Sequence, residues 1–173
     1  MKKILSVCLM TIIAVACNNA DKPAATASSD STTYPYKASY SSTVSLSTNS
    51  KNAQAVLQSY KDWEDNKLSN GTAYFADTVT MIFSDGTTYH LGRDSMLHVF
   101  QKDRDSLTST VIDMQVWTNL RLDDKKEDWV GCWYKQTDTH KNGKIDSAFY
   151  QDDNRIKDGK IDLVISKKRA IKK

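Results

Sequence analysis

Apolar residues recur at helical spacing in one segment in the first half of the chain. Across residues 51–67 they fall three or four positions apart and form this set: Ala53, Val56, Leu57, Tyr60 and Trp63. Because an α-helix completes a turn every 3.6 residues, this spacing gathers them on one face. The pattern predicts an amphipathic helix whose apolar face packs on a core.

A short helix, a hairpin and a third helix are predicted next along the chain. The aromatic pair at 74–75 indicates a short second helix that runs into a strand at 78–83. The Ser-Asp-Gly sequence at 84–86 then marks a turn into another strand at 87–91. The Gly-Arg-Asp-Ser sequence at 92–95 opens the third helix, because Asp and Ser are favoured N-cap residues.

Beyond Ser109 the apolar period changes to two. Residues 112–122 alternate between apolar and polar side chains, which is typical of a half-buried strand, and only Trp117 breaks the polar face. Both faces of 129–134 are apolar, so we expect this strand to be covered on both sides. The helices supply one cover, and a second copy of the chain is the candidate for the other.

An internal repeat predicts two β-hairpins near the C-terminus. Lys-Asn-Gly-Lys-Ile-Asp at 141–146 returns as Lys-Asp-Gly-Lys-Ile-Asp at 157–162. Asn-Gly and Asp-Gly favour two-residue turns, in which both central residues take positive φ. The sequence therefore predicts four long antiparallel strands after three N-terminal helices, which is an α+β fold.

The N-terminus has a different character. Residues 1–17 carry two lysines, an apolar run and small residues that end in Cys17, the layout of a secretory signal too short to span a bilayer. The ending resembles the bacterial lipobox, whose Cys is acylated, although Ala14 stands where Leu is usual. We expect lipid on Cys17 to hold the protein at a membrane. Secretory cleavage beside an incidental Cys is the alternative.

The segment between this signal and the first helix predicts a linker. Residues 18–52 are dominated by Ser, Thr, Ala and Asn and show no apolar period, so they cannot bury enough apolar surface to offset the entropy of ordering. The domain then spans 53–168, and 169–173 is a basic tail. Asn18 is not the Asp associated with inner-membrane retention. By this resemblance we expect the outer membrane of the cell envelope.

The charge and the cysteine content exclude some functions and some roles for Cys132. The formal net charge of +3 includes Lys2 and Lys3, and without them it falls to +1, so no basic field for nucleic acid is present. Cys8 is in the signal and Cys17 is the acylation candidate, so Cys132 has no partner for a disulfide. Because Cys132 lies in an apolar run without a neighbouring His, we expect a buried thiol and not a nucleophile.

The order of elements resembles the nuclear transport factor 2-like superfamily, specifically its SnoaL-like members. The resemblance covers 53–168 and is carried by these residues: Tyr60, Trp63, Phe75-Ala76-Asp77, Asp85-Gly86, Gly92-Arg93 and Asp158-Gly159-Lys160-Ile161. It implies a curved antiparallel sheet wrapped into a cone-shaped α+β barrel, with the three helices closing an apolar pocket. Members include isomerases, dehydratases, polyketide cyclases and non-catalytic binding domains, so the fold does not decide the function.

The resemblance also implies which residues line the pocket. The candidates are mostly aromatic: Tyr60, Trp63, Phe75, Arg93, Trp117, Trp133 and Tyr150. From the helix pattern alone, Tyr60 and Trp63 fit an ordinary core better, but in this fold the same face of the helix also lines the cavity. Arg93 is expected to pair with Asp77 at the pocket rim.

Three titratable residues are candidates for catalysis. Acid–base enzymes of this superfamily place an Asp, often with a Tyr or His, in the pocket, where burial raises the carboxyl pKa. The candidates here are Asp85, His90 and Asp146. Each has a simpler interpretation, which is a turn residue for Asp85, a hydrogen-bonded core or edge histidine for His90, and a solvent-facing carboxylate for Asp146.

Metal and cofactor sites have no convincing signature. The histidines at 90, 98 and 140 are dispersed and form no short ligand pair. Residues 138–149 resemble a calcium loop, but Phe149 stands where that loop needs a bidentate Glu. No glycine-rich phosphate loop or nucleophilic Ser motif is present, so we expect no cofactor and no metal.

The sequence therefore favours a lipid-anchored envelope protein whose pocket binds a small apolar or aromatic molecule. An acid–base enzyme of the isomerase or dehydratase kind and a module that dimerises through its sheet remain alternatives.

Overall fold

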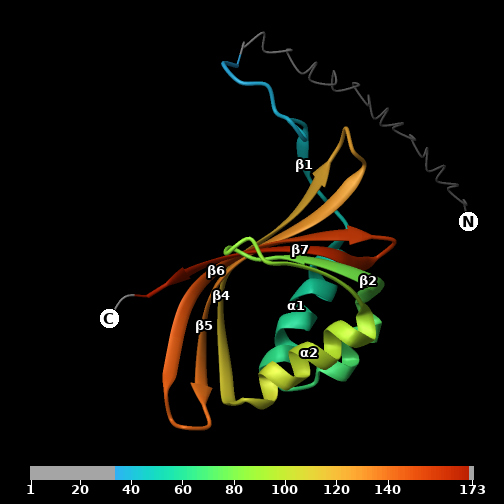
Figure 1. The fold of residues 1–173 in the computed structure, drawn as a ribbon. Coiled ribbons are helices and arrows are strands. Elements are labelled where there is room, and N and C mark those ends of the chain that lie inside the picture. The colour runs from blue at the N-terminus through green and yellow to red at the C-terminus, as the bar shows by residue number, and fades with distance from the viewer. Residues whose placement is uncertain (1–33, 172–173) are drawn as a thin grey trace, which may run out of the picture. The chain divides into compact units, whose positions relative to one another are not determined.

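The computed structural model describes residues 34–171; the predicted signal, Cys17 and much of the predicted linker lie outside the described residues. From Tyr36 onward the chain forms one unit. Its elements follow in this order: β1 (Val44–Leu46), α1 (Ser50–Glu64), the 3₁₀-helix η1 (Leu68–Ala73), β2 (Phe75–Ile82), β3 (Thr88–Gly92), α2 (Arg93–Asp105), β4 (Leu107–Leu122), β5 (Glu127–His140), β6 (Ile145–Lys157) and β7 (Lys160–Ala170) (Figure 1).

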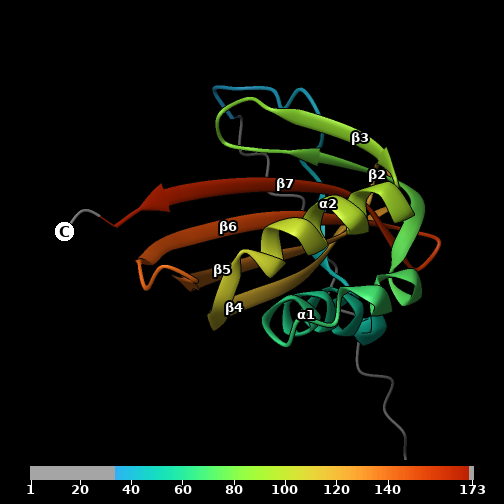
Figure 2. The same ribbon diagram turned by 60° about the horizontal axis from the view of Figure 1, so that its bottom comes forward.

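The seven strands within residues 34–171 form one sheet in the order β1-β4-β5-β6-β7-β2-β3. Strands β4 to β7 are the predicted antiparallel meander, but β2 pairs with β7 in parallel, so the sheet is mixed and not purely antiparallel as expected. The chain leaves β2 through β3, α2 and the meander, and it returns beside β2 in the same direction. The sheet curves around α1 and α2 without closing, because β1 and β3 remain its edges (Figure 2).

The first helix forms where it was predicted, but the second is shorter and of another type. Helix α1 begins at the N-cap Asn49, whose side-chain oxygen accepts the Lys51 N–H at 3.2 Å. The second helix is a 3₁₀ turn that ends at Ala73, because Phe75 starts β2 and the Tyr74 carbonyl accepts the Ile161 N–H at 2.8 Å. The three helices of the described residues do not precede the sheet as a block, since β1 comes before α1, and β2 and β3 lie between η1 and α2.

The two predicted hairpins are present and differ in their turns. Asp158 and Gly159 both take positive φ, at 51° and 74°, as a two-residue turn requires. In the first repeat only Gly143 does, at 80°, and the loop is wider, with the His140 N–H donating to the Lys144 carbonyl at 2.8 Å.

Alternate residues of β5 face opposite sides of the sheet. Val130, Cys132 and Tyr134 belong to the core beneath the helices, together with Val56 of α1 and Ile161 of β7. The expectation of a buried Cys132 is confirmed. On the other face, the Trp133 ring lies over Gly131, where a Cβ atom would come within 3.2 Å of the indole.

Part of the predicted linker is ordered against the domain. Strand β1 pairs with the end of β4, with Ser45 opposite Arg121. The Ser47 N–H also donates to the Asn119 carbonyl at 2.8 Å, and the Tyr40 hydroxyl donates to Glu127 at 2.7 Å. At the other end, β7 extends to Ala170 and includes the first residues of the predicted basic tail. No helix among residues 34–171 is long and apolar enough to cross a membrane.

Candidate functional site

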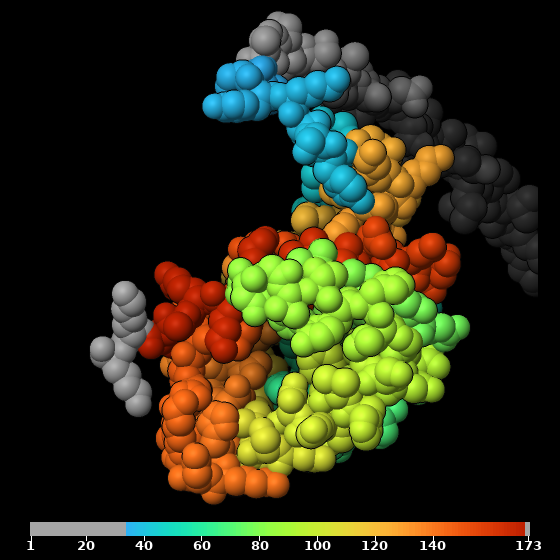
Figure 3. All heavy atoms as spheres, viewed as in Figure 1, coloured from blue at the N-terminus to red at the C-terminus, as the bar shows by residue number. Residues whose placement is uncertain are grey.

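A cavity of about 240 Å³ lies between the helices and the concave face of the sheet. Figure 3 shows the surface hollowed between α2 and the strands β5 and β6. Helices, strands and the turn after β2 all contribute to the lining, which consists of Ser59, Tyr60, Trp63, Leu68, Tyr74, Phe75, Met81, Phe83, Met96, Leu97, Phe100, Tyr134, Gln136, Tyr150, Asp152, Asn154, Val164 and Ser166.

Aromatic rings form much of the wall, since eight of the lining residues are aromatic. The Tyr134 ring stacks on Tyr150 with centroids 5.2 Å apart and lies 5.0 Å from Tyr60. The Trp63 ring meets Phe100 of α2 edge-on at 6.3 Å. These contacts hold rings from α1, α2, β5 and β6 in place around a small apolar space.

One carboxylate, that of Asp152 on β6, stands in this wall and is only 4% exposed. Its Oδ2 accepts hydrogen bonds from the hydroxyls of Tyr60 and Tyr134, both at 2.8 Å. Asn154, two residues along the same face of β6, donates from Nδ2 to the Val130 carbonyl at 3.1 Å and to the Tyr60 hydroxyl at 3.3 Å. The cluster joins α1 to both central strands of the meander.

The second oxygen of Asp152 is not satisfied. Oδ1 is buried and has no hydrogen-bond partner among the described residues. Ser166 lies directly opposite on β7, close enough for its hydroxyl to favour the charged carboxylate, but it does not complete a hydrogen bond to Oδ1. Because buried polar atoms are nearly always paired, this unpaired oxygen of a cavity-lining residue marks a candidate contact for a bound molecule.

Burial controls the protonation of the whole cluster. It raises the pKa of Asp152 above the ordinary value, while the hydroxyls of Ser166, Tyr134 and Tyr60 act in the opposite direction. Burial also raises the pKa of Tyr60 and Tyr134, so both remain hydrogen-bond donors at neutral pH. The pKa of the Cys132 thiol rises to about 12 through burial and the nearby Asp152 charge, which keeps the thiol neutral and unreactive.

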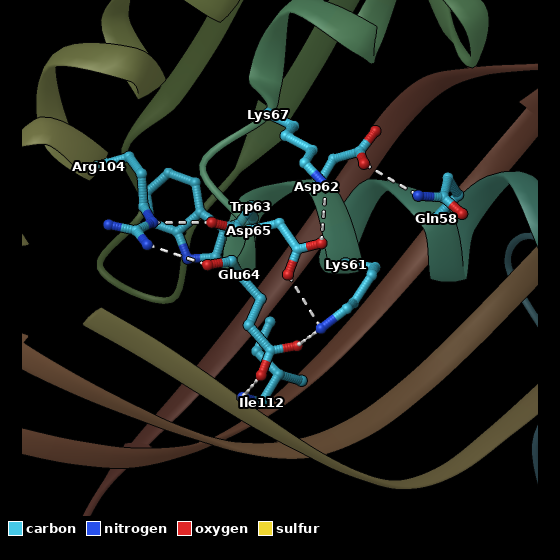
Figure 4. A network of polar contacts seen from close by, with 9 residues as sticks. All are labelled: Gln58, Lys61, Asp62, Trp63, Glu64, Asp65, Lys67, Arg104 and Ile112. Atoms are coloured by element: carbon cyan, nitrogen blue, oxygen red, sulfur yellow. Dashed lines mark hydrogen bonds and ion pairs between the residues drawn. The ribbon is translucent and has the colours of Figure 1, made fainter.

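The end of α1 that carries Trp63 is held by polar contacts (Figure 4). Arg104 of α2 donates from Nε to the Trp63 carbonyl at 2.8 Å and from a terminal nitrogen to the Glu64 carbonyl at 3.0 Å. The Ile112 N–H of β4 donates to the Glu64 carboxylate at 3.4 Å. A cation at the C-terminal carbonyls of a helix stabilises it, so this network fixes one wall of the cavity.

Four of the predicted pocket residues line this cavity: Tyr60, Trp63, Phe75 and Tyr150. Three do not. Trp117 is 52% exposed and is not part of the lining, although β4 pairs it with Cys132 of the core face. Trp133 is on the opposite face of the sheet from Tyr134. Arg93 pairs with Asp77 at 2.9 Å, as expected, but lines a separate polar depression.

The three catalytic candidates all lie outside the cavity and are exposed. Asp85 accepts the Thr87 N–H at 2.9 Å in the turn after β2, and this bond lowers its pKa. His90 is on the edge strand β3, with Nδ1 2.9 Å from the Thr80 hydroxyl. Asp146 accepts a bond from Lys144 at 2.9 Å, which lowers its pKa. In each case the simpler interpretation fits the structure.

Sequence reasoning missed Asp152, the polar centre of the cavity. A signal was present, because Ala148, Tyr150 and Ile156 set a period of two along this strand. Extending that period places Asp152 and Asn154 on the same buried face, where the structure has them. The five consecutive polar residues at 151–155 obscured the alternation.

The described residues contain no group of three or more His, Cys, Asp or Glu side chains that could hold a metal ion. The polar groups of the cavity are instead one carboxylate, amides, hydroxyls and the Trp63 indole N–H, which suit hydrogen bonding to an organic molecule.

No protein-family model matches the sequence, and a search of curated proteins finds no match. Solved structures do resemble the fold. An LEH-like epoxide hydrolase from M. tuberculosis aligns with a TM-score of 0.58 and 9% identity, over 69% of this chain and 84% of that one. A candidate polyketide cyclase from Acidithiobacillus ferrooxidans aligns with a TM-score of 0.57 and 15% identity, over 71% and 91% of the two chains.

An NTF2-like protein of unknown function from Burkholderia pseudomallei aligns with a TM-score of 0.51 and 17% identity, over 67% of this chain and 88% of that one. Structural likeness at such low sequence identity shows a common fold and does not show a common chemistry. The chain therefore has the nuclear transport factor 2-like fold, of the kind found in SnoaL-like proteins.

Proposed function

We propose that this protein is a lipid-anchored envelope protein whose cavity binds a small, largely apolar or aromatic molecule. The observation that carries the proposal is a mostly aromatic cavity with a buried carboxylate, Asp152, one oxygen of which has no partner among the described residues. Sites for small molecules have this composition, in which apolar walls supply affinity and a few polar groups fix orientation. An engineered cavity of about 150 Å³ accepts benzene, so about 240 Å³ suits one ring with a short substituent.

Filling the cavity tests the proposal. Ser59 lines the cavity from α1, while Gln54 is on the same helix and exposed. We expect single-ring fragments to bind the wild type and Gln54→Trp, and Ser59→Trp to lose binding because the indole occupies the space. Ligand-observed NMR measures the binding, and circular dichroism checks the fold of each variant. Absence of binding to the wild type, or undiminished binding to Ser59→Trp, contradicts the proposal.

A second candidate is an acid–base enzyme of the isomerase or dehydratase kind. Asp152 favours it, because a buried carboxylate with a raised pKa and a free oxygen can accept a proton from a bound substrate. Such an enzyme would exchange the acidic C–H protons of a bound carbonyl compound with D₂O, and Asp152→Asn would abolish the exchange. Binding without any exchange argues for the non-catalytic function.

Dimerisation through the outer face of the sheet also remains a proposal. Trp129 and Trp133 are half-buried on that face, and Val116, opposite Trp133 on β4, is exposed. A second copy would remove these apolar side chains from water. A monomer in light scattering at micromolar concentration contradicts this proposal.

A further inference from the structure

We propose that the cavity selects a ligand with a positive charge, namely a protonated or quaternary amine on a small apolar or aromatic body. This inference rests on the proposed binding function and specifies the chemistry of the ligand. It starts from the charges of the lining. Asp152 is the one carboxylate in the lining, and the lining includes no Lys, Arg or His among the described residues.

The carboxylate lacks a counter-ion. Its contacts with Tyr60 and Tyr134 are hydrogen bonds from neutral hydroxyls, and both end on Oδ2. A buried charge is costly unless a charge of opposite sign accompanies it. No ion pair to Asp152 is present within residues 34–171, and its β6 neighbour Asp153 pairs instead with Lys167 at 2.8 Å on the other face. An ammonium group at Oδ1 would supply both the missing charge and the missing donor.

The rings around Asp152 favour the same kind of ligand. Tyr60 and Tyr134 touch the carboxylate, and Tyr150 stacks on Tyr134. The faces of aromatic rings attract cations, most strongly where water is excluded. One such cation–π contact is present nearby, where the Lys168 ammonium lies 5.6 Å from the centre of the Tyr150 ring. Lys168 is exposed and is not part of the cavity lining.

The same groups disfavour other ligands. An anionic ligand would place a second negative charge beside Asp152 with no basic residue in the lining to compensate. A neutral alcohol can donate to Oδ1 but leaves the charge unpaired. The cavity therefore discriminates by charge among molecules of equal size and apolar surface.

Three probes of one shape test this: phenethylammonium, 2-phenylethanol and phenylacetate. They are titrated into the full chain carrying Cys17→Ser, by calorimetry at about pH 8, where an ordinary carboxylate is ionised and the amine is charged. We expect phenethylammonium to bind about tenfold or more tightly than 2-phenylethanol, and phenylacetate to bind most weakly. Asp152→Asn should remove the preference for the cation, whereas Asp153→Asn should retain it.

The outcomes separate this inference from the proposed function. If 2-phenylethanol binds as tightly as phenethylammonium, the preference for a cation is wrong and the binding function stands. A preference that survives in Asp152→Asn also overturns the inference. If none of the three probes binds the Cys17→Ser chain with Asp152 intact, both the inference and the proposed function fail together. The comparison of probes on the wild type does not depend on the folding of any variant.

Discussion

At the scale of single residues, Asp152 is held by its neighbours at a cost to stability. Burial opposes its charge, and the bonds from Tyr60 and Tyr134 offset only part of that penalty because Oδ1 stays unpaired. Functional carboxylates commonly have raised pKa values for this reason, since the environment that tunes them also destabilises their ionised form.

Replacing this carboxylate should change how stability depends on pH. The pKa of Asp152 is raised in the folded state, so protonation of Asp152 stabilises the folded protein relative to the unfolded chain. This stabilisation is complete below the pKa of about 3.9 in the unfolded chain, and it is lost as the pH rises through the pKa of the folded state. Asp152→Asn removes this loss. Its urea midpoint relative to the wild type should therefore be higher at about pH 8 than at about pH 4.

Asp153→Asn is the matched control, because it removes the same charge from the opposite face of the strand, where Asp153 pairs with Lys167. The stability of Asp153→Asn relative to the wild type should not rise with pH as that of Asp152→Asn does. A gain for Asp152→Asn that is constant from acid to alkaline pH would show that its carboxyl has no raised pKa.

At the scale of elements, strand β1 completes one edge of the sheet. It pairs with the end of β4, and its Ser45 hydroxyl donates at 2.9 Å to Asp123 in the turn between β4 and β5. These bonds tie the start of α1 to the sheet through Asn119, whose Nδ2 donates to the Asn49 carbonyl at 2.7 Å. A short, bonded strand at an edge also reduces pairing with other chains.

Two truncations measure what this segment contributes. A chain that starts at Tyr36 should be as stable as the Cys17→Ser full chain. A chain that starts at Ser47 should lose roughly 1–3 kcal/mol of unfolding free energy, because the strand pairing and the Tyr40 and Ser45 bonds are gone. Denaturant unfolding gives both values. Equal stability of the two truncated chains would mean that the segment adds nothing to the fold.

At the scale of the whole molecule, the expected lipid anchor sets where the cavity meets its ligand. Cys17 lies outside the described residues, and the proposal rests on its sequence context, a basic start, an apolar run and small residues before the Cys. Several acyl chains bind a membrane stably where a single chain is marginal.

Cys17→Ser should therefore move the protein from the membrane fraction to the soluble fraction and abolish labelling by a fatty-acid analogue. Cys8→Ser, which changes another thiol of the same predicted signal, should leave both unchanged. Density-gradient separation of the membranes then tests the expected outer-membrane location. Continued membrane association of Cys17→Ser would refute the anchor.

The sequence by itself determined the elements whose cause is local. The apolar spacing from Ala53 to Trp63 indicated α1, and the Asp158-Gly159 turn indicated the last hairpin, because helix periodicity and turn dihedrals depend on neighbouring residues. Tyr60 and Trp63 could be proposed for the cavity because a helix has one face to bury.

Only the tertiary structure decided which distant segments meet. It placed β2 parallel to β7, paired β1 with β4, and brought the Tyr60 hydroxyl to Asp152. It also put Trp133 on the outer face of the sheet and Trp117 in solvent, although both were expected in the cavity. Such contacts depend on strand order, register and irregularities across the whole sheet, which the pattern of one segment does not contain.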